Sequence, residues 1–469
     1  MQLEAIVQQT FGFAGFRPRQ REIIEHILSP AGAEGTLVVM PTGGGKSLIY
    51  QVAALTVQRL SIVVSPLIAL MKDQVDALRA RGVAAACVHS GLSTRELIET
   101  RDRVLAGQIR LLYVAPERFK NRNFMAVVAR QPLYLLAIDE AHCISHWGSG
   151  FRPSYRHLPA AIAALRPDRV LALTATANHQ TRHDICTNLG LPRAHCFITG
   201  FRRDDLRFGR CRLDGNAYFN TRDAVLDRYD PEADSACGIV YLGTRKNCER
   251  LVADLERWSI PVAFYHAGMR DVDKQRVQEE WMRRDGVMVA TTAFGMGIDK
   301  PNVRFVINGS LPANVEEWYQ MIGRGSRDGR GCHCQLFSDA EDLRIRHFLL
   351  EIQYPPVTEL RRFRRWLDAT SRTEGERTLE ATQDDLAAAA GIRPHTASGC
   401  CTICARYGLM EQLAPGRWRL LHRPEIRIDE AELERQRAAK LVDLERVRRI
   451  IRRGGDLLGA ICTYMESGD

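Results

Sequence analysis

Nine short apolar runs limit how this 469-residue chain can fold. Each run is rich in Val, Ile, Leu and Ala, and the longer segments between the runs carry helical spacing. Strands that are apolar on both faces are typical of parallel sheets covered by helices on both sides. The alternation of runs and helical segments therefore predicts an α/β fold.

The runs form two series on either side of a polar stretch at residues 201–234. The first series lies at residues 36–40, 62–65, 111–115, 134–139 and 170–174, and the second at 238–242, 262–266, 287–291 and 305–308. Two series predict two parallel-sheet domains, which we place at residues 1–205 and 206–340.

The remaining residues, 341–469, follow a mostly helical pattern that predicts an accessory region. Its expected elements are helices at 383–390 and 394–407, a turn at Gly391, a hairpin around Pro415-Gly416 and a closing helix at 430–451. Two helices followed by a hairpin form the outline of a winged helix over about residues 378–422, although other small helical pairs share this outline.

Composition and charge narrow the function classes. The net charge is +9, and +8 of it lies in residues 1–340, which permits a polyanionic partner but is also typical of a solubilised surface. No apolar run is long enough to cross a membrane, and the N-terminus does not resemble a secretory signal. The thirteen Cys are scattered, which favours a reduced environment. We therefore expect a cytoplasmic protein with no membrane partner, nucleoid-associated if bacterial.

Residues 41–47 (PTGGGKS) follow a predicted strand and open a predicted helix, which is the context of a phosphate-binding loop. Glycines allow backbone N–H groups to surround phosphate, and the helix N-terminus favours negative charge. Lys46 is expected to contact the β- and γ-phosphates and Ser47 to bind Mg²⁺. The residues predicted to surround ATP here are Thr42, Gly43, Gly44, Gly45, Lys46 and Ser47. Met40 stands where the general pattern has Gly.

Asp139 and Glu140 follow the apolar run at residues 134–139. Asp139 is expected to hold Mg²⁺, and Glu140 to orient or deprotonate the attacking water. Adjacent acids after a strand are common by chance, but together with the loop at residues 41–47 they indicate a nucleotide hydrolase.

Several further motifs resemble the RecQ family of superfamily 2 DNA helicases over roughly residues 8–340. They lie at residues 11–20, 64–74, 115–118, 142–153, 173–177, 240–246, 265–269, 290–301 and 318–329. The resemblance implies two tandem RecA-like domains and an ATP-dependent helicase of 3′–5′ polarity that acts in DNA repair or recombination.

For ATP, the resemblance implies that Gln20 hydrogen-bonds adenine while Phe13 and Arg17 stack on it. Gln320 would contact ATP, and Arg324 and Arg327 would reach the γ-phosphate as arginine fingers. Three positions depart from the family pattern: Asn308 replaces a usual His, Met321-Ile322 replaces Glu-Thr, and Gly325-Ser326 replaces Ala-Gly.

For DNA, the most diagnostic stretch is residues 142–153. Trp147 and Phe151 would stack on unpaired bases and Arg152 would contact phosphate, although Trp and Phe would also suit a core. The other positions that the resemblance assigns to DNA are Ser65, Pro66, Arg118, Thr244, Arg245, His266 and Thr291. Single-stranded and forked DNA are the expected partners; the oligomeric state is left open, with a monomer plausible.

Members of the family typically carry a zinc module with four Cys, and no such quartet is found in this sequence. Cys401 and Cys404, with Cys400 beside them, fit a buried helix face better than a metal site. Cys332 and Cys334 lie on an alternating strand with too few accompanying ligands. ATP and Mg²⁺ are therefore the expected cofactors, and zinc is not.

Two other functions stay open at this point. One is an ATP-driven nucleic-acid translocase that does not separate strands. The other is a winged-helix DNA-binding clamp gated by nucleotide, whose hydrolytic core has decayed. Retention of Lys46, Asp139, Glu140, Arg324 and Arg327 argues against decay.

Overall fold

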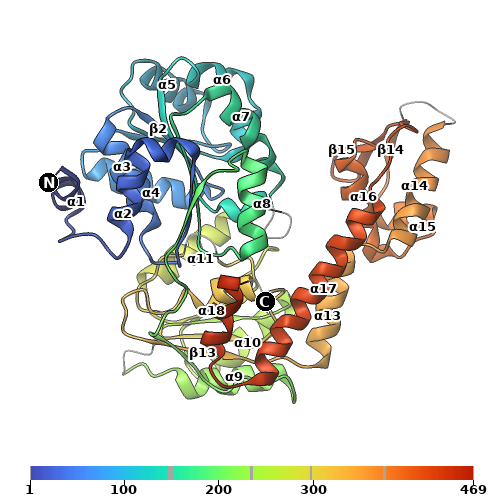
Figure 1. Cartoon of the computed structure of the whole chain (residues 1–469). Coiled ribbons are helices and arrows are strands. Elements are labelled where there is room, and N and C mark those ends of the chain that lie inside the picture. Colours follow the sequence, from blue (N-terminus) through green and yellow to red (C-terminus); the bar gives the residue numbers. More distant parts are fainter. Residues whose placement is uncertain (1, 146–151, 233–235, 296–297, 373–376, 468–469) are drawn as a thin grey trace.

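The computed structural model describes residues 2–145, 152–232, 236–295, 298–372 and 377–467. Two α/β domains lie one above the other, and an accessory lobe projects to one side (Figure 1). In these ranges, no helix is both long and apolar enough to span a bilayer.

The first domain contains a seven-stranded parallel sheet in the order β3-β4-β2-β5-β6-β1-β7. Its strands are β1 (Thr36–Val39), β2 (Leu60–Val64), β3 (Ala85–Val88), β4 (Leu111–Val114), β5 (Leu133–Ile138), β6 (Arg169–Thr174) and β7 (His195–Ile198). The five predicted strands are confirmed to within two residues. The two that the apolar runs did not indicate, β3 and β7, form the edges of the sheet.

Helices cover both faces of this sheet. The α-helices are α1 (Gln2–Phe11), α2 (Gln20–Leu28), α3 (Lys46–Val57), α4 (Ile68–Ala80), α5 (Thr94–Leu105), α6 (Arg122–Val128), α7 (Leu158–Leu165) and α8 (His179–Leu189). Short 3₁₀ turns are η1 (Pro30–Glu34), η2 (Pro116–Lys120), η3 (Ala141–Ile144) and η4 (Pro153–His157). Buried aliphatic side chains pack between each helical layer and the strands.

The second domain contains a six-stranded parallel sheet in the order β10-β11-β9-β12-β13-β8. Its strands are β8 (Leu206–Phe208), β9 (Gly238–Tyr241), β10 (Val262–Tyr265), β11 (Val287–Ala290), β12 (Phe305–Asn308) and β13 (Cys332–Leu336), and its helices are α9 (Ala217–Arg228), α10 (Arg245–Glu256), α11 (Asp271–Arg283) and α12 (Val315–Ile322). The four predicted strands and the alternating strand around Cys332 are confirmed. The polar stretch at residues 201–234 contributes the short edge strand β8.

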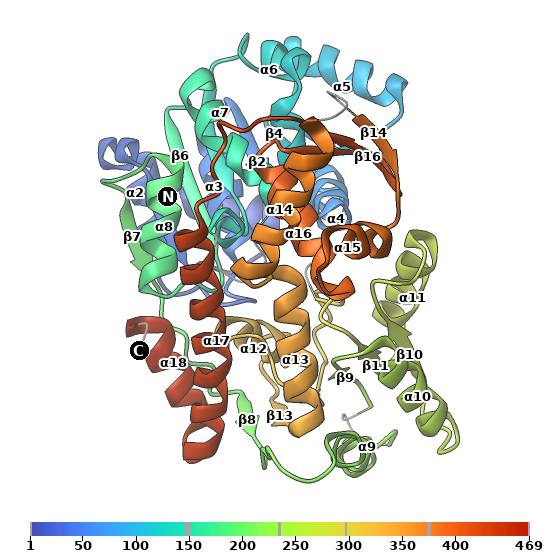
Figure 2. The ribbon, with the colours of Figure 1, turned by 90° about the vertical axis from the view of Figure 1, so that its right-hand side faces the viewer.

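The accessory region runs out along α13 (Ala340–Gln353) and returns along α17 (Glu430–Arg453) (Figure 1). Between them lie α14 (Val357–Arg372), β14 (Arg377–Glu380), α15 (Gln383–Ala390), α16 (Pro394–Arg406), β15 (Met410–Ala414) and β16 (Arg417–Leu420). Figure 2 shows this lobe facing the viewer. The two predicted helices and the hairpin are present. The third strand, β14, pairs with β16 and was not predicted.

Cys400, Cys401 and Cys404 lie buried in the core of the accessory lobe on one face of α16. Burial raises the pKa of the Cys401 and Cys404 thiols to about 12, so both are neutral at physiological pH. No group of three or more His, Cys, Asp or Glu side chains suited to a metal ion occurs among the described residues.

The last helix, α18 (Leu457–Ser467), leaves the accessory region and packs against both α/β domains. It contacts α8 of the first domain and α12 of the second. In Figure 1 it lies below α8, at the boundary between the two domains.

Candidate active site

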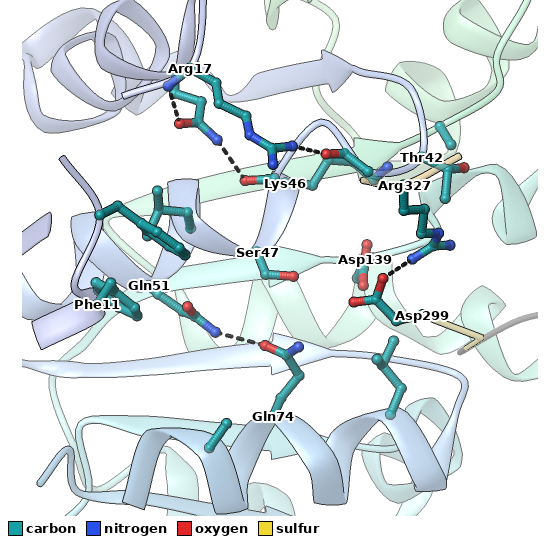
Figure 3. A pocket seen from close by; sticks show the side chains of 18 of the residues that line it. Phe11, Arg17, Thr42, Lys46, Ser47, Gln51, Gln74, Asp139, Asp299 and Arg327 are labelled. Atoms are coloured by element: carbon teal, nitrogen blue, oxygen red, sulfur yellow. Dashed lines mark hydrogen bonds and ion pairs between the residues drawn. The ribbon is translucent and has the colours of Figure 1, made fainter. Parts of the chain in front are cut away.

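A cavity of about 580 Å³ lies between the two α/β domains (Figure 3). The first domain contributes Lys46, Ser47, Asp139 and Glu140, and the second contributes Gln320, Arg324 and Arg327. Residues that the sequence analysis assigned to two different domains therefore line one cavity. Those of the first domain follow the carboxyl ends of β1 and β5, where α/β sheets typically bind ligands, and those of the second come from α12 and the segment directly after it.

The glycine-rich loop joins β1 to α3 and needs glycine for two reasons. Gly43 and Gly45 have φ angles of +80° and +82°, which side chains rarely adopt. A Cβ on Gly45 would lie 2.4 Å from Nε2 of Gln20, and one on Gly44 would lie 2.5 Å from Cγ of Met40. The Met that departs from the general pattern thus packs directly under the loop.

Lys46 begins α3, and its side chain folds back beneath the loop. Its Nζ donates to the carbonyl oxygens of Met40 at 3.0 Å and Pro41 at 3.3 Å. Burial lowers the pKa of Lys46, and the carboxylates of Glu140 and Asp139 oppose that shift. The ammonium is thus held close to the loop backbone, where it would meet the β- and γ-phosphates of a nucleotide.

Asp139 and Glu140 follow the end of β5. Burial and, after it, the neighbouring Glu140 carboxylate raise the pKa of Asp139 to about 7, against the opposing effect of Lys46. A divalent cation would favour the ionised carboxylate. Ser47 and Asp139 line the same cavity and supply the oxygen ligands that Mg²⁺ prefers. They fit an ion that is held mainly by nucleotide phosphates and water, since Mg²⁺ usually takes one or two protein carboxylates.

A chain of polar contacts leads from Glu140 to the second domain. Nδ1 of His142 lies 3.3 Å from Oε2 of Glu140 and 2.9 Å from Oγ1 of Thr174. The Thr174 hydroxyl donates to the carbonyl of Thr176 at 3.2 Å, and Nε2 of Gln320 donates to Oγ1 of Thr176 at 2.7 Å. The acid at the cavity is therefore connected to α12. The sequence analysis assigned no role to His142, because its contacts with Glu140 and Thr174 form only in the folded chain.

The two arginines differ in their surroundings. Arg324 is 8% exposed, burial lowers its pKa, and within the described ranges its side chain has no carboxylate partner. Arg327 forms an ion pair with Asp299, a residue that the sequence analysis did not assign to the site (Figure 3). A buried guanidinium without a counter-ion is unfavourable, so this side of the cavity suits an anionic ligand.

The residues expected to bind adenine lie at the far end of the cavity. Phe13 is 51% exposed and its ring stacks on Phe11 at 6.5 Å. The Gln20 amide accepts from N–H of Arg17 at 2.8 Å and donates to the carbonyl of Gly45 at 3.1 Å. The Arg17 guanidinium donates to the carbonyl of Gly43. In this arrangement Gln20 and Arg17 bind the loop backbone, so an adenine contact would require one of these bonds to be exchanged.

The residues assigned to DNA lie beyond strand ends in both domains. Ser65 and Pro66 follow β2, Arg118 lies in η2 after β4, and Thr244, His266 and Thr291 follow β9, β10 and β11. Nη1 of Arg152 donates to the carbonyl of Pro66 at 3.0 Å. Trp147 and Phe151 lie outside the described residues.

Two of these side chains, Ser65 and His266, are buried, whereas Arg245 is exposed. Ser65 is buried, and its hydroxyl has no partner among the described residues. His266 is also buried, with Nε2 3.2 Å from Oε1 of Glu249. The Arg245 guanidinium covers Gly268, since a Cβ there would lie 2.6 Å from its Nη1. We therefore expect Arg245 to be the more accessible of the three.

Replacing Gly45 by Ala tests the loop. The new Cβ meets the Gln20 amide and strains the backbone, so we expect nucleotide binding to weaken at least about ten-fold. Titration with a fluorescent ATP analogue would measure it. Gly107→Ala is the matched control, because Gly107 also has a positive φ of 66° but has no atom within 4 Å of its Cβ position. Equal loss of affinity in both variants would contradict the role of the loop.

The raised pKa of Asp139 predicts a pH dependence of magnesium binding. Below about 7 the carboxyl group is neutral, and above that value it is ionised, so affinity for Mg²⁺ with a non-hydrolysable ATP analogue should rise as pH rises through this range. Calorimetric titration at several pH values would measure it. The Asp139→Asn variant should bind more weakly and lose most of this dependence; an unchanged profile would contradict the assignment.

Two family descriptions match the chain. The DEAD/DEAH box helicase family matches residues 17–185, and the helicase conserved C-terminal domain matches residues 217–329. The ATP-dependent DNA helicase RecQ of Bacillus subtilis is 39% identical over 350 residues, which cover 74% of this chain and 58% of the relative. The mouse ATP-dependent DNA helicase Q5 is 38% identical over 379 residues, covering 76% and 38% of the two chains.

Solved structures share the fold at lower identity. Mss116p, solved with single-stranded RNA and AMP-PNP, has a TM-score of 0.60 and 16% identity, covering 74% of each chain. The helicase Lhr of Mycobacterium smegmatis, solved with single-stranded DNA and AMP-PNP, has a TM-score of 0.54 and 18% identity, covering 93% of this chain and 61% of that one.

The chain spans little more than half the length of its bacterial relatives. Identity to proteins named RecQ nevertheless extends over about three quarters of this chain, and the two helicase families match its two parallel sheets. The chain therefore belongs to the RecQ family of ATP-dependent DNA helicases.

Proposed function

We propose that this chain is an ATP-dependent DNA helicase that moves 3′ to 5′ along single-stranded DNA and separates duplexes, in DNA repair or recombination. One observation carries the proposal: residues of a phosphate-binding loop, an acidic pair and two arginines from different domains line one cavity. The names of the relatives, which are DNA helicases, support the choice of DNA as the substrate.

Hydrolysis would use residues from both sides of the cavity. The loop backbone and Lys46 would hold the phosphates, and Ser47 and Asp139 would hold Mg²⁺, which would supply positive charge against the phosphates. Glu140 orients the attacking water and accepts its proton. Arg324 and Arg327 stabilise charge that builds on the γ-phosphate, and Arg327 exchanges Asp299 for that anion.

Movement would follow from closing and opening the cavity. Bound ATP attracts cations from both domains, and that attraction weakens when the γ-phosphate leaves. The contacts from Glu140 through His142 and Thr174 to Gln320 connect the hydrolytic acid to the second domain. If each domain grips the same strand, one cycle advances them along it.

The proposed DNA path follows strand ends in both domains. Arg118, Arg152 and Arg245 supply positive charge for phosphates, and the hydroxyls of Ser65 and Thr291 supply further donors. Trp147 and Phe151 are proposed to stack on bases, which is tolerant of sequence. The accessory lobe, as a winged-helix candidate, is proposed to contact the duplex at a fork through its hairpin around Gly416.

Strand displacement on DNA with a 3′ or a 5′ overhang tests the proposal. We expect ATP-dependent unwinding of the 3′-tailed substrate, with DNA-stimulated release of phosphate. Lys46→Ala should lower hydrolysis at least about 100-fold, because an essential contact to the transferred phosphoryl group is lost. Lys274→Ala, which removes a surface ion pair with Asp271, is the matched control.

The outcomes separate the alternatives. Preference for the 5′-tailed substrate would contradict the proposed 3′–5′ polarity. DNA-stimulated hydrolysis without strand separation would favour a translocase, and DNA binding without hydrolysis would favour a nucleotide-gated clamp. Comparable unwinding of RNA would contradict DNA as the specific substrate.

A further inference from the structure

Helix α18 joins three parts of the molecule through a ring of hydrogen bonds. The Tyr464 hydroxyl donates to Oε1 of Glu316 at 2.8 Å. Nδ2 of Asn178 donates to the same Oε1 at 2.8 Å and also to the Tyr464 oxygen at 2.8 Å. Asn178 precedes α8 in the first domain, Glu316 lies on α12 in the second, and Tyr464 lies on α18. The ring therefore connects the two domains to the end of the accessory region.

This ring is buried. Glu316 is 3% exposed and Tyr464 is 2% exposed. A buried carboxylate is unfavourable unless donors surround it, so each of the two bonds to Glu316 contributes more than it would at a surface. Asp443 and Lys440 of α17 are the charged groups that act on Glu316, and Arg446 of α17 stacks on the Tyr464 ring at 4.9 Å.

A second contact attaches α18 to the same helix of the first domain. The Arg182 guanidinium, on α8, donates to the carbonyl oxygens of Met465 at 3.2 Å and Glu466 at 3.0 Å. These carbonyls lie at the C-terminal end of α18, where helix carbonyls lack intrahelical partners and favour a cation. The attachment of α18 to the first domain thus has two separate points, one at the Tyr464 side chain and one at the carbonyls of Met465 and Glu466.

The ring lies next to the interdomain contact that leads to the active site. Glu316 is one helical turn before Gln320, so both side chains lie on the same face of α12. Gln320 donates to Thr176, and Asn178 is two residues beyond Thr176. Along this face the next position is Gly323, whose Cβ would lie 3.8 Å from Cβ of Thr42 in the phosphate-binding loop. Arg324 follows directly and lines the cavity.

We propose that Tyr464 is a positioning residue for ATP hydrolysis, which holds α12 against the first domain through Glu316 and Asn178 so that Gln320 and Arg324 face the nucleotide. The inference rests on the proposed ATP-dependent function and goes beyond it, because it assigns a role in the active site to a helix that follows the accessory lobe. Tyr464 is not among the described residues that line the cavity.

The Tyr464→Phe variant tests this role, because it removes one hydroxyl and keeps the buried ring. Loss of a buried hydrogen bond to a charged group shifts the equilibrium between closed and open domains by about ten-fold. We therefore expect the DNA-stimulated kcat to fall by about that factor, with KM for ATP changing much less. Thr463→Ala is the matched control, since its exposed hydroxyl bonds only to Gly459 of its own helix.

Two variants of Glu316 separate positioning from simple packing. Glu316→Gln keeps an oxygen that accepts from Tyr464 and Asn178, so it should retain most of the kcat. The Glu316→Leu variant has no acceptor, so its kcat should fall by about the same factor as that of Tyr464→Phe. Equal loss of kcat in the Glu316→Gln and Glu316→Leu variants would show that the ring of hydrogen bonds is not what positions α12.

Hydrogen exchange gives a readout that does not depend on turnover. Tyr464→Phe should speed amide exchange in α12 and at the start of α8, and Thr463→Ala should not. Unchanged exchange, or a lower melting temperature with an unchanged kcat at 25 °C, would overturn the inference while leaving the proposed function in place. Absence of DNA-stimulated hydrolysis in the wild-type chain would overturn both.

Discussion

Three cations line the cavity between the two domains, together with the carboxylates of Asp139, Glu140 and Asp299. Lys46 comes from the first domain, and Arg324 and Arg327 come from the second. The charge of Arg327 lowers the pKa of both Lys46 and Arg324, and the Glu140 carboxylate raises both, which are the expected signs for like and opposite charges in a site of low dielectric. A triphosphate would add further negative charge between the cations of the two domains. In the proposed mechanism it therefore favours closure of the domains, and loss of the γ-phosphate favours their opening.

The parallel sheets make this convergence possible. The carboxyl ends of β1 and β5 bring the loop at Lys46 and the acid at Asp139 together, although 93 residues separate them in the chain. In the second sheet, β12 leads into α12, which carries Gln320 toward the first domain and ends just before Arg324. The proximity of Lys46 and Asp139 thus depends on strand order, since a different order would separate them along the sheet.

Local sequence signals predicted most of the strands and the glycine-rich loop. Strands buried on both faces produce continuous apolar runs, and a glycine-rich turn before a helix predicts a phosphate site without knowledge of the fold. Three of the four edge strands, β3, β7 and β8, were not predicted; β7 and β8 are partly exposed, whereas the edge strand β10 has an apolar run and was predicted. The sequence pattern could therefore place the centre of each sheet better than its edges.

Contacts between distant segments could not be read from the sequence. Nothing near Gln20 indicates that its amide binds the backbone of the loop at Gly45, and nothing near Asp299 indicates a pair with Arg327. The same holds for His142, whose partner Thr174 lies on another strand. Each of these residues lies in a stretch that resembles a family motif, but these particular contacts exist only through tertiary packing.

Helix α17 connects the accessory lobe to the ring formed by Asn178, Glu316 and Tyr464. It begins beside the accessory lobe and runs along the second domain to its lower part, where the chain turns back into α18 (Figure 1). Lys440 and Asp443, near the middle of α17, act on Glu316, and Arg446 lies over the Tyr464 ring. If Tyr464 positions α12 as proposed, a displacement of α17 would act on α12 at Glu316, one turn from Gln320. Hydrogen bonds weaken steeply with distance and angle, so a small displacement would be enough to weaken the ring. In this mechanism the lobe would change the rate of hydrolysis without contacting the nucleotide.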